Sequence, residues 1–228
     1  TTEIYTLSLH DALPISLGGK TGSVSIIGAV SPPGGDFSEP VTQHTKRFVS
    51  TFWALDKELA SARYFPAINY LSSYSGYIDS VATWWKDKAG LDWVDLRDRA
   101  LSVLTEEARL QNIVKLIGED ALPDDQKATF HGARIIKEDF LQQSANDPVD
   151  TYSSALKQVL MLRIILRFIE GMRAGVAKRI PVYRMLDLPV LEELHRMKYT
   201  HKGDDPGPFE AILALVEKEF AQLLRREG

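Results

Sequence analysis

The chain has 228 residues, with 27 Lys and Arg against 31 Asp and Glu, so its formal net charge is −4, and 44% of its residues are hydrophobic. This composition suits one large or two small globular domains with a core, and the mildly acidic balance argues against nucleic-acid binding because no basic excess exists to pair with phosphates. The chain contains no cysteine, which excludes disulfides, thiolate metal sites and cysteine nucleophiles.

The first sixteen residues differ in character from the rest. Thr6–Ile15 resembles, letter for letter, the translation of a common DNA-sequencing adapter; an ordinary amphipathic tail is the alternative. No Lys or Arg precedes Lys20, so the positive region of a signal peptide is missing. We therefore predict that residues 1–16 are a non-native tail and that the natural protein continues upstream.

The residue pattern of the next part of the chain is typical of an α/β domain. Ser23–Val30 is a β-branched run between glycines, which is typical of a buried strand, and the proline- and glycine-rich segment Ser31–Asp36 predicts a rigid loop. Arg47–Leu55 could be strand or helix by periodicity, and its aromatic and β-branched residues favour a strand.

After Pro66 the pattern becomes helical, with clear start and stop signals. Asp92 and Pro123 are typical of first turns, whereas Gly90 and Gly118 are typical of helix ends. These signals predict helices over residues 74–88, 92–104, 106–117, 123–142 and 150–178, short helices after residues 181 and 189, and a last helix over residues 208–226.

The most apolar run of the chain is Leu156–Ile169, and Arg163 and Arg167 interrupt it. A membrane-spanning helix needs roughly 20 consecutive apolar residues, so this run predicts a helix buried in a bundle, with both arginines on one face.

Motifs for catalysis are weak. Gly18–Thr21 resembles the end of a phosphate-binding P-loop, but it precedes a predicted strand instead of opening a helix, and Pro14 stands where the first glycine belongs. The five histidines show no metal-ligand spacing, and no nucleophile elbow occurs. Chemistry alone therefore assigns no active site and no metal site.

Several segments of the chain carry a family resemblance. They are residues 22–42, 52–56, 64–75, 114–118 and 138–143, which include Ser-Pro-Pro-Gly-Gly-Asp, Tyr-Phe-Pro-Ala-Ile-Asn-Tyr and Asp-Phe-Leu-Gln-Gln. In this order they resemble the catalytic A (alpha) chain of V-type and archaeal-type ATPases and ATP synthases, from Leu17 to the C-terminus and most strongly up to Val149.

This resemblance implies an α/β remnant followed by an all-α domain. Residues 17–75 would be the last strands of a P-loop-type (RecA-like) nucleotide-binding domain, and residues 76–228 a C-terminal helical bundle. The P-loop, the Mg²⁺-positioning acidic residue and the catalytic glutamate of the family lie upstream, so this stretch alone should bind no cofactor through its own chemistry and should not hydrolyse ATP.

The resemblance also implies two sites. Phe65 and Phe140 would be aromatic walls for the adenine of ATP or ADP, with Gln142 and Gln143 nearby; the alternative is that both phenylalanines are core residues. Glu119, Asp120, Asp124 and Asp125 would form an acidic helix-turn-helix lever against a basic rotor, unless this turn is merely solvated. The Ser31–Asp36 loop would lie near the rotor axis or act as a hinge.

The implied full-length protein is a cytoplasmic, membrane-peripheral component that couples ATP synthesis or hydrolysis to proton or sodium translocation. Its partners would be B chains of a hexameric head and central-stalk rotor subunits, without nucleic acid and with the membrane reached only through the complex. The alternatives are the non-catalytic B chain, which an upstream P-loop would separate from the catalytic chain, and an orphan helical interaction module without nucleotide binding. The sheet residues should expose an edge and an apolar face.

Overall fold

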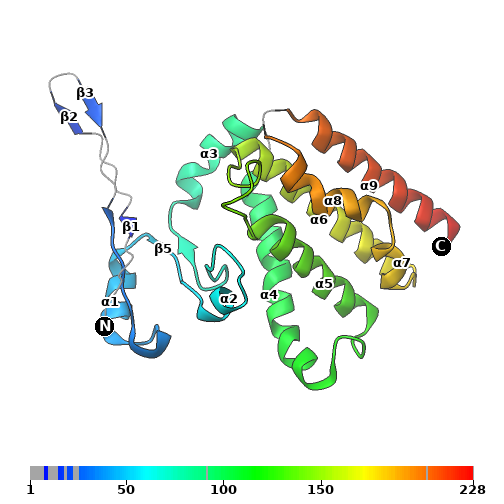
Figure 1. Ribbon diagram of the computed structural model, residues 1–228, viewed down its shortest axis with the longest axis horizontal. Helices are drawn as coiled ribbons and strands as arrows, with labels where there is room; N and C mark the ends of the chain where they lie inside the picture. Colours follow the sequence, from blue (N-terminus) through cyan, green and yellow to red (C-terminus); the bar gives the residue numbers. More distant parts are fainter. Residues whose placement is uncertain are drawn as a thin grey trace. The chain divides into compact units, whose positions relative to one another are not determined.

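A computed structural model describes residues 8–9, 15–17, 20–22, 26–90, 92–203 and 205–227, with side chains from Ile26 onward. The chain divides after Val81 into two units, and each is described by itself. Figure 1 shows strands and short helices in the first unit and a bundle of longer helices in the second.

The first unit contains a small antiparallel sheet. Its four strands follow the order β4-β1-β5-β6, and β2 pairs with β3 separately. The strand bounds are β1 (Ser8–Leu9), β2 (Ile15–Leu17), β3 (Lys20–Gly22), β4 (Ile26–Ile27), β5 (Thr51–Phe52) and β6 (Tyr74–Ser75). The register places Ser8 opposite both Ile27 and Thr51.

The predicted strand over residues 23–30 is much shorter in the structure. Residues 23–25 lie outside the described residues, and of the remainder only Ile26–Ile27 forms a strand. The prediction of burial is wrong, because the Ile26 and Ile27 side chains are 55% and 65% exposed. β4 is an edge strand, so it has one neighbour where a buried strand has two.

The predicted strand Arg47–Leu55 is also largely wrong. A helix, α1 (Pro40–Phe48), takes up its first two residues, and only Thr51–Phe52 is a strand. The Glu39 carboxylate accepts hydrogen bonds from the amides of Val41 and Thr42, and Pro40 occupies the first turn. This cap and the preset proline backbone start a helix that continues into the first two residues of the predicted strand.

The core of the first unit is small. Val49, Phe52 and Ala54 are buried, and Phe37 and Tyr74 pack against them. The remaining short elements are a 3₁₀ turn, η1 (Pro33–Gly35), within the predicted rigid loop, and a helix, α2 (Lys57–Ser61).

The second unit is helical, as predicted. α3 begins in the first unit, and the helices after it lie wholly in the second. Their bounds are α3 (Ile78–Ala89), α4 (Trp93–Ile117), α5 (Asp124–Ile135), η2 (Ile136–Leu141), α6 (Ala155–Ala177), α7 (Val182–Leu186), α8 (Val190–Thr200) and α9 (Gly207–Arg226).

Three helix predictions need correction. The helix predicted over residues 74–88 begins only at Ile78, because Tyr74–Ser75 pairs with β5 as strand β6. The two helices expected between Asp92 and Ile117 are one, since the Thr105 hydroxyl donates to the carbonyl of Leu101 within the turn and nothing there breaks the helix. The long helix does not begin at Asp150. Ser154 caps it by accepting from the amide of Lys157, and Asp150 is a buried loop residue.

The predicted buried helix is α6, which packs against α4, α5 and α9. Its two arginines share a face as expected, because Arg163 pairs with Glu210 and Arg167 with Glu217, both on α9. Within the described part of the chain, no helix is both long and apolar enough to cross a bilayer.

Candidate functional site

The segment that carries Phe140 has an unusual backbone. It is a π-helix, η2, which continues α5 and ends where the Gln142 amide donates to the carbonyl of Lys137, five residues earlier. Such wide turns are frequently found at functional sites. The wide turn leaves Phe140 half-buried beside the loop that leads to α6.

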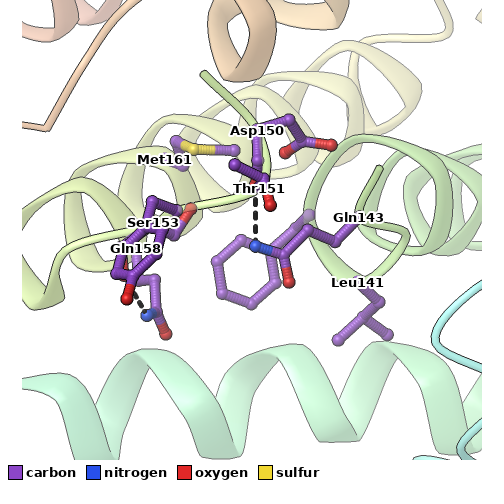
Figure 2. A pocket seen from close by; sticks show the side chains of 9 residues that line it. Leu141, Gln143, Asp150, Thr151, Ser153, Gln158 and Met161 are labelled. Atoms are coloured by element: carbon purple, nitrogen blue, oxygen red, sulfur yellow. Dashed lines mark hydrogen bonds between the residues drawn. The ribbon is translucent and has the colours of Figure 1, made fainter. Parts of the chain in front are cut away.

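Phe140 lines a cavity of about 430 Å³, a volume in the range of small-molecule sites. Figure 2 shows its side chains converging from η2, from the loop after it and from the start of α6. The lining residues are Phe140, Leu141, Gln143, Asp150, Thr151, Tyr152, Ser153, Gln158 and Met161.

Two glutamine amides contribute to the polar part of this cavity. The Gln143 Nε2 atom donates to the carbonyl of Asp150 at 2.7 Å, and the Gln158 Nε2 atom donates to the carbonyl of Ser153 at 3.0 Å (Figure 2). Both donors are engaged with the loop backbone, which fixes the two side chains. The arrangement combines an aromatic face and a thioether with oriented amide groups.

The loop between η2 and α6 is held by its own carboxylates. Asp147 accepts from the amides of Val149 and Asp150, and these bonds hold the pKa of its carboxyl below the usual range. The buried Asp150 carboxylate accepts from the amide of Ser144 at 2.6 Å. The wall of the cavity is therefore built before any ligand enters.

The residue before Phe140 is hydrogen-bonded to a histidine. Asp139, which is buried, and His195 of α8 are 2.7 Å apart between Oδ2 and Nδ1. The hydrogen bond to Asp139 raises the pKa of His195.

The other predicted site is the turn between α4 and α5. Asp120, Asp124 and Asp125 are exposed. Glu119 is instead turned inward, 3.2 Å from His131 and 2.9 Å from Arg134. Three of the four predicted carboxylates are therefore exposed, and the fourth, Glu119, bonds side chains of α5.

Comparison with known proteins identifies the family. Residues 82–184 match the model of the C-terminal domain of V and A type ATP synthase, and residues 10–75 match the ATP synthase alpha/beta family, nucleotide-binding domain. The A (alpha) chain of the A-type ATP synthase of Thermococcus onnurineus (strain NA1) is 49% identical over 212 residues, 92% of this chain and 35% of that protein. The chain belongs to the A (alpha) chain family of A-type and V-type ATP synthases.

Further relatives agree with this alpha-chain assignment. The V-type ATP synthase alpha chain of Halothermothrix orenii is 48% identical over 90% of this chain and 35% of its own length. The chain thus spans about a third of these curated relatives. Both relatives are A (alpha) chains, so the B-chain alternative is not favoured.

A solved structure of ATP synthase subunit NeqB from Nanoarcheaum equitans shares the fold. Its TM-score is 0.54 at 22% identity, over 65% of this chain and 36% of that one.

The predicted adenine residues of this alpha-family chain fall in two places. Phe140 and Gln143 line the cavity, within the match to the C-terminal domain. Gln142 does not line it, and its backbone carbonyl accepts from Lys198. Phe65 lies in the other unit, in the nucleotide-binding match, with its side chain 53% exposed.

Sequence reasoning missed the far wall of the cavity. Thr151, Ser153, Gln158 and Met161 line it, and no motif marks them. The one available signal was Ser153-Ser154 directly before the apolar run, which is typical of a helix start.

The structure also bears on phosphate and metal binding. Lys20 and Thr21 lie in β3 and do not open a helix. A P-loop binds phosphate at a helix N-terminus, so Gly18–Thr21 is not a phosphate-binding loop here. Among the residues that the structure describes, no group of three or more His, Asp or Glu could hold a metal ion.

Proposed function

We propose that the cavity beside Phe140 receives the adenine base of ATP or ADP, in a chain that is the C-terminal part of the catalytic subunit of a rotary ATPase or ATP synthase. One observation carries this proposal. Phe140 and Gln143 line one cavity of small-molecule size, within the match to the C-terminal domain of the family.

The chemistry of the cavity suits a flat heteroaromatic base. A phenylalanine face contributes stacking and apolar contact, and the side chain of Met161 adds a polarizable surface. Gln143 is fixed through its Nε2 atom, so its side-chain oxygen is left as an acceptor for an exocyclic amino group. Adenine carries such a group and uracil does not, which predicts a preference for adenine.

Phosphate chemistry and Mg²⁺ binding are assigned to other parts of the full-length protein. The described residues offer no cluster that fits a metal ion, and Lys20 lies in a strand. We expect the 228-residue chain to release no phosphate from ATP, and measurable hydrolysis would overturn this part of the proposal.

Binding of adenosine to the 228-residue chain, which the sequence alone does not lead us to expect, tests the proposal. Saturation-transfer NMR should show contact at the base protons of adenosine, and less contact with uridine. Phe140→Leu should weaken adenosine binding by about 2- to 10-fold, the value of an aromatic stacking pair, and Phe140→Tyr should preserve it.

The matched control is Phe130→Leu. Phe130 is also half-buried on the same run of helix, but it contacts Arg134 and does not line the cavity. Equal effects of the two leucine variants, or no adenosine binding by the unmodified chain, would exclude the adenine site.

We also propose that the α4–α5 turn contacts a basic surface of the rotor. The three exposed carboxylates are Asp120, Asp124 and Asp125, and charge complementarity favours a Lys- or Arg-rich partner. Leu116 and Ile117, 86% and 57% exposed at the end of α4, add an apolar contact beside them.

The test replaces the three aspartates by asparagine in the assembled complex. Ion transport per ATP hydrolysed should fall, whereas Asp79→Asn with Asp87→Asn on α3 should leave it unchanged. Unchanged coupling in the triple variant would exclude the turn as a rotor contact.

A further inference from the structure

Two buried lysines bond the backbone next to residues that line the cavity. The side chains of Lys157 on α6 and Lys198 on α8 belong to residues that are 0% and 2% exposed. Burying an ammonium group costs free energy unless hydrogen bonds replace its water. Neither lysine pairs closely with a carboxylate in the described ion pairs, so backbone carbonyls take that role.

Lys198 holds the backbone on both sides of Phe140. Its Nζ atom donates to the carbonyl of Glu138 at 2.5 Å and to the carbonyl of Gln142 at 3.0 Å. These carbonyls lie at the C-terminal end of η2, where a helix leaves acceptors unpaired and favours a cation. Phe140 is midway between the two anchored residues.

Lys157 connects Lys198 to the loop between η2 and α6. Its Nζ atom donates to the carbonyl of Lys198 at 2.7 Å and to the carbonyl of Val149 at 3.3 Å. Val149 precedes Asp150, whose carbonyl accepts from the Gln143 amide. The two ammonium groups thus link η2, the loop and the end of α8 in one continuous chain of hydrogen bonds.

His195 gives α8 a third contact with the same segment. It lies one turn before Lys198 on α8 and pairs with Asp139, the neighbour of Phe140. Side chains of α8 therefore form hydrogen bonds with Glu138, Asp139 and Gln142. Phe140, which lies between these residues, lines the cavity.

We propose that Lys198 is a positioning residue for base binding: by fixing the carbonyls of Glu138 and Gln142 it sets the orientation of Phe140 toward the base. This role rests on the adenine site proposed above. The competing explanation is that Lys198 only stabilises the fold, in which case its loss would weaken binding no more than any other loss of stability.

The absence of cysteine allows a direct test in the 228-residue chain. Lys198→Cys removes the ammonium group, and aminoethylation of this single thiol in denaturant, followed by refolding, restores a lysine-like side chain. Adenosine affinity, measured by NMR, should fall by about 2- to 10-fold in Lys198→Cys, as in Phe140→Leu, because the same stacking contact is lost. Aminoethylation should restore it.

A double variant separates positioning from stability. If Lys198 acts through Phe140, then Lys198→Cys combined with Phe140→Leu should bind adenosine no more weakly than Phe140→Leu alone, since coupled residues are not additive. Val216→Ala, a buried change on α9 away from this cavity, should lower the melting temperature without changing affinity. If Lys198→Cys does not refold, Lys198→Gln replaces it in the same cycle.

The outcomes are distinct. Additive losses in the double variant, or full affinity in Lys198→Cys, would overturn the positioning role and leave the adenine site intact. Failure of the unmodified chain to bind adenosine would overturn both.

Discussion

The histidines His131 and His195 show how the same side chain titrates differently in two settings. Burial lowers the pKa of His131, although Glu119 partly opposes this effect. The hydrogen bond to Asp139 instead raises the pKa of His195 from its ordinary value of 6.5. The two groups therefore change stability with pH in opposite directions.

For His195 the sign follows from its raised folded-state pKa. Below pH 6.5 the imidazole is charged in both the folded and the unfolded chain, and the pair with Asp139 contributes fully. As the pH rises through the raised folded-state pKa, the proton is lost and this contribution disappears. We expect His195→Gln to destabilise the chain at pH 6 and to have less effect at pH 8.5, as urea unfolding would measure.

His131→Gln is the matched control. Its lowered folded-state pKa makes the native histidine unfavourable as the pH falls below 6.5, so this variant should gain stability relative to the unmodified chain toward pH 5. A pH-independent effect of His195→Gln would show that the ion pair with Asp139 contributes nothing in solution.

At the residue scale, the cavity was only half predictable from sequence. Phe140 and Gln143 were found through a family resemblance, not from any motif of their own. Lys157 and Lys198 were missed because a lysine is almost never fully buried, and their acceptors are backbone carbonyls that leave no trace in the sequence. The sequence predicts Glu119 as part of the rotor contact because it does not reveal that His131 and Arg134 of α5 bind this carboxylate.

At the scale of elements, the contact between α6 and α9 depends on close approach. Gly171 of α6 faces Phe220 of α9, and a Cβ atom at Gly171 would lie 2.6 Å from ring carbons. Phe220 also packs edge-to-face on Phe168, with ring centroids 5.1 Å apart. The ring is held from two sides and has little room to shift.

We therefore expect Gly171→Ala to destabilise the chain by about 1–2 kcal/mol in urea unfolding. The overpacking costs about 1–3 kcal/mol, and the better helix propensity of alanine offsets up to about 1 kcal/mol of it. In a Phe220→Leu background, which removes the ring, the same change should cost less. A stabilising effect of Gly171→Ala, or equal costs in both backgrounds, would contradict close packing here.

Helices were predictable where one residue fixes their ends. Asp92 does accept from the amide of Asp95, and Pro123 does precede α5. Strands were not, because their burial depends on neighbours that a local pattern does not contain. Arg47–Leu55 satisfies strand propensity, yet the helix capped at Glu39 takes up Arg47 and Phe48, and only Thr51–Phe52 forms a strand.

At the scale of the whole molecule, the two units differ in the core they can build. From Ile26 onward, where the structure describes side chains, the first unit buries the hydrophobic residues Val49, Phe52 and Ala54, whereas the core of the second extends over α4 to α9. Large side chains stay exposed in the first unit. They are Ile26, Ile27, Val41, Phe48, Trp53, Leu55, Phe65 and Leu71.

This difference predicts separate behaviour of the two parts in solution. Residues 76–228, which keep α3 whole, should form a monomer that unfolds in one cooperative transition, because a continuous core is buried there. The 228-residue chain should associate or bind a hydrophobic dye through the exposed apolar side chains of its first unit. Size-exclusion chromatography and dye fluorescence compare the two. A monomeric, dye-silent 228-residue chain would mean that these side chains are covered in solution.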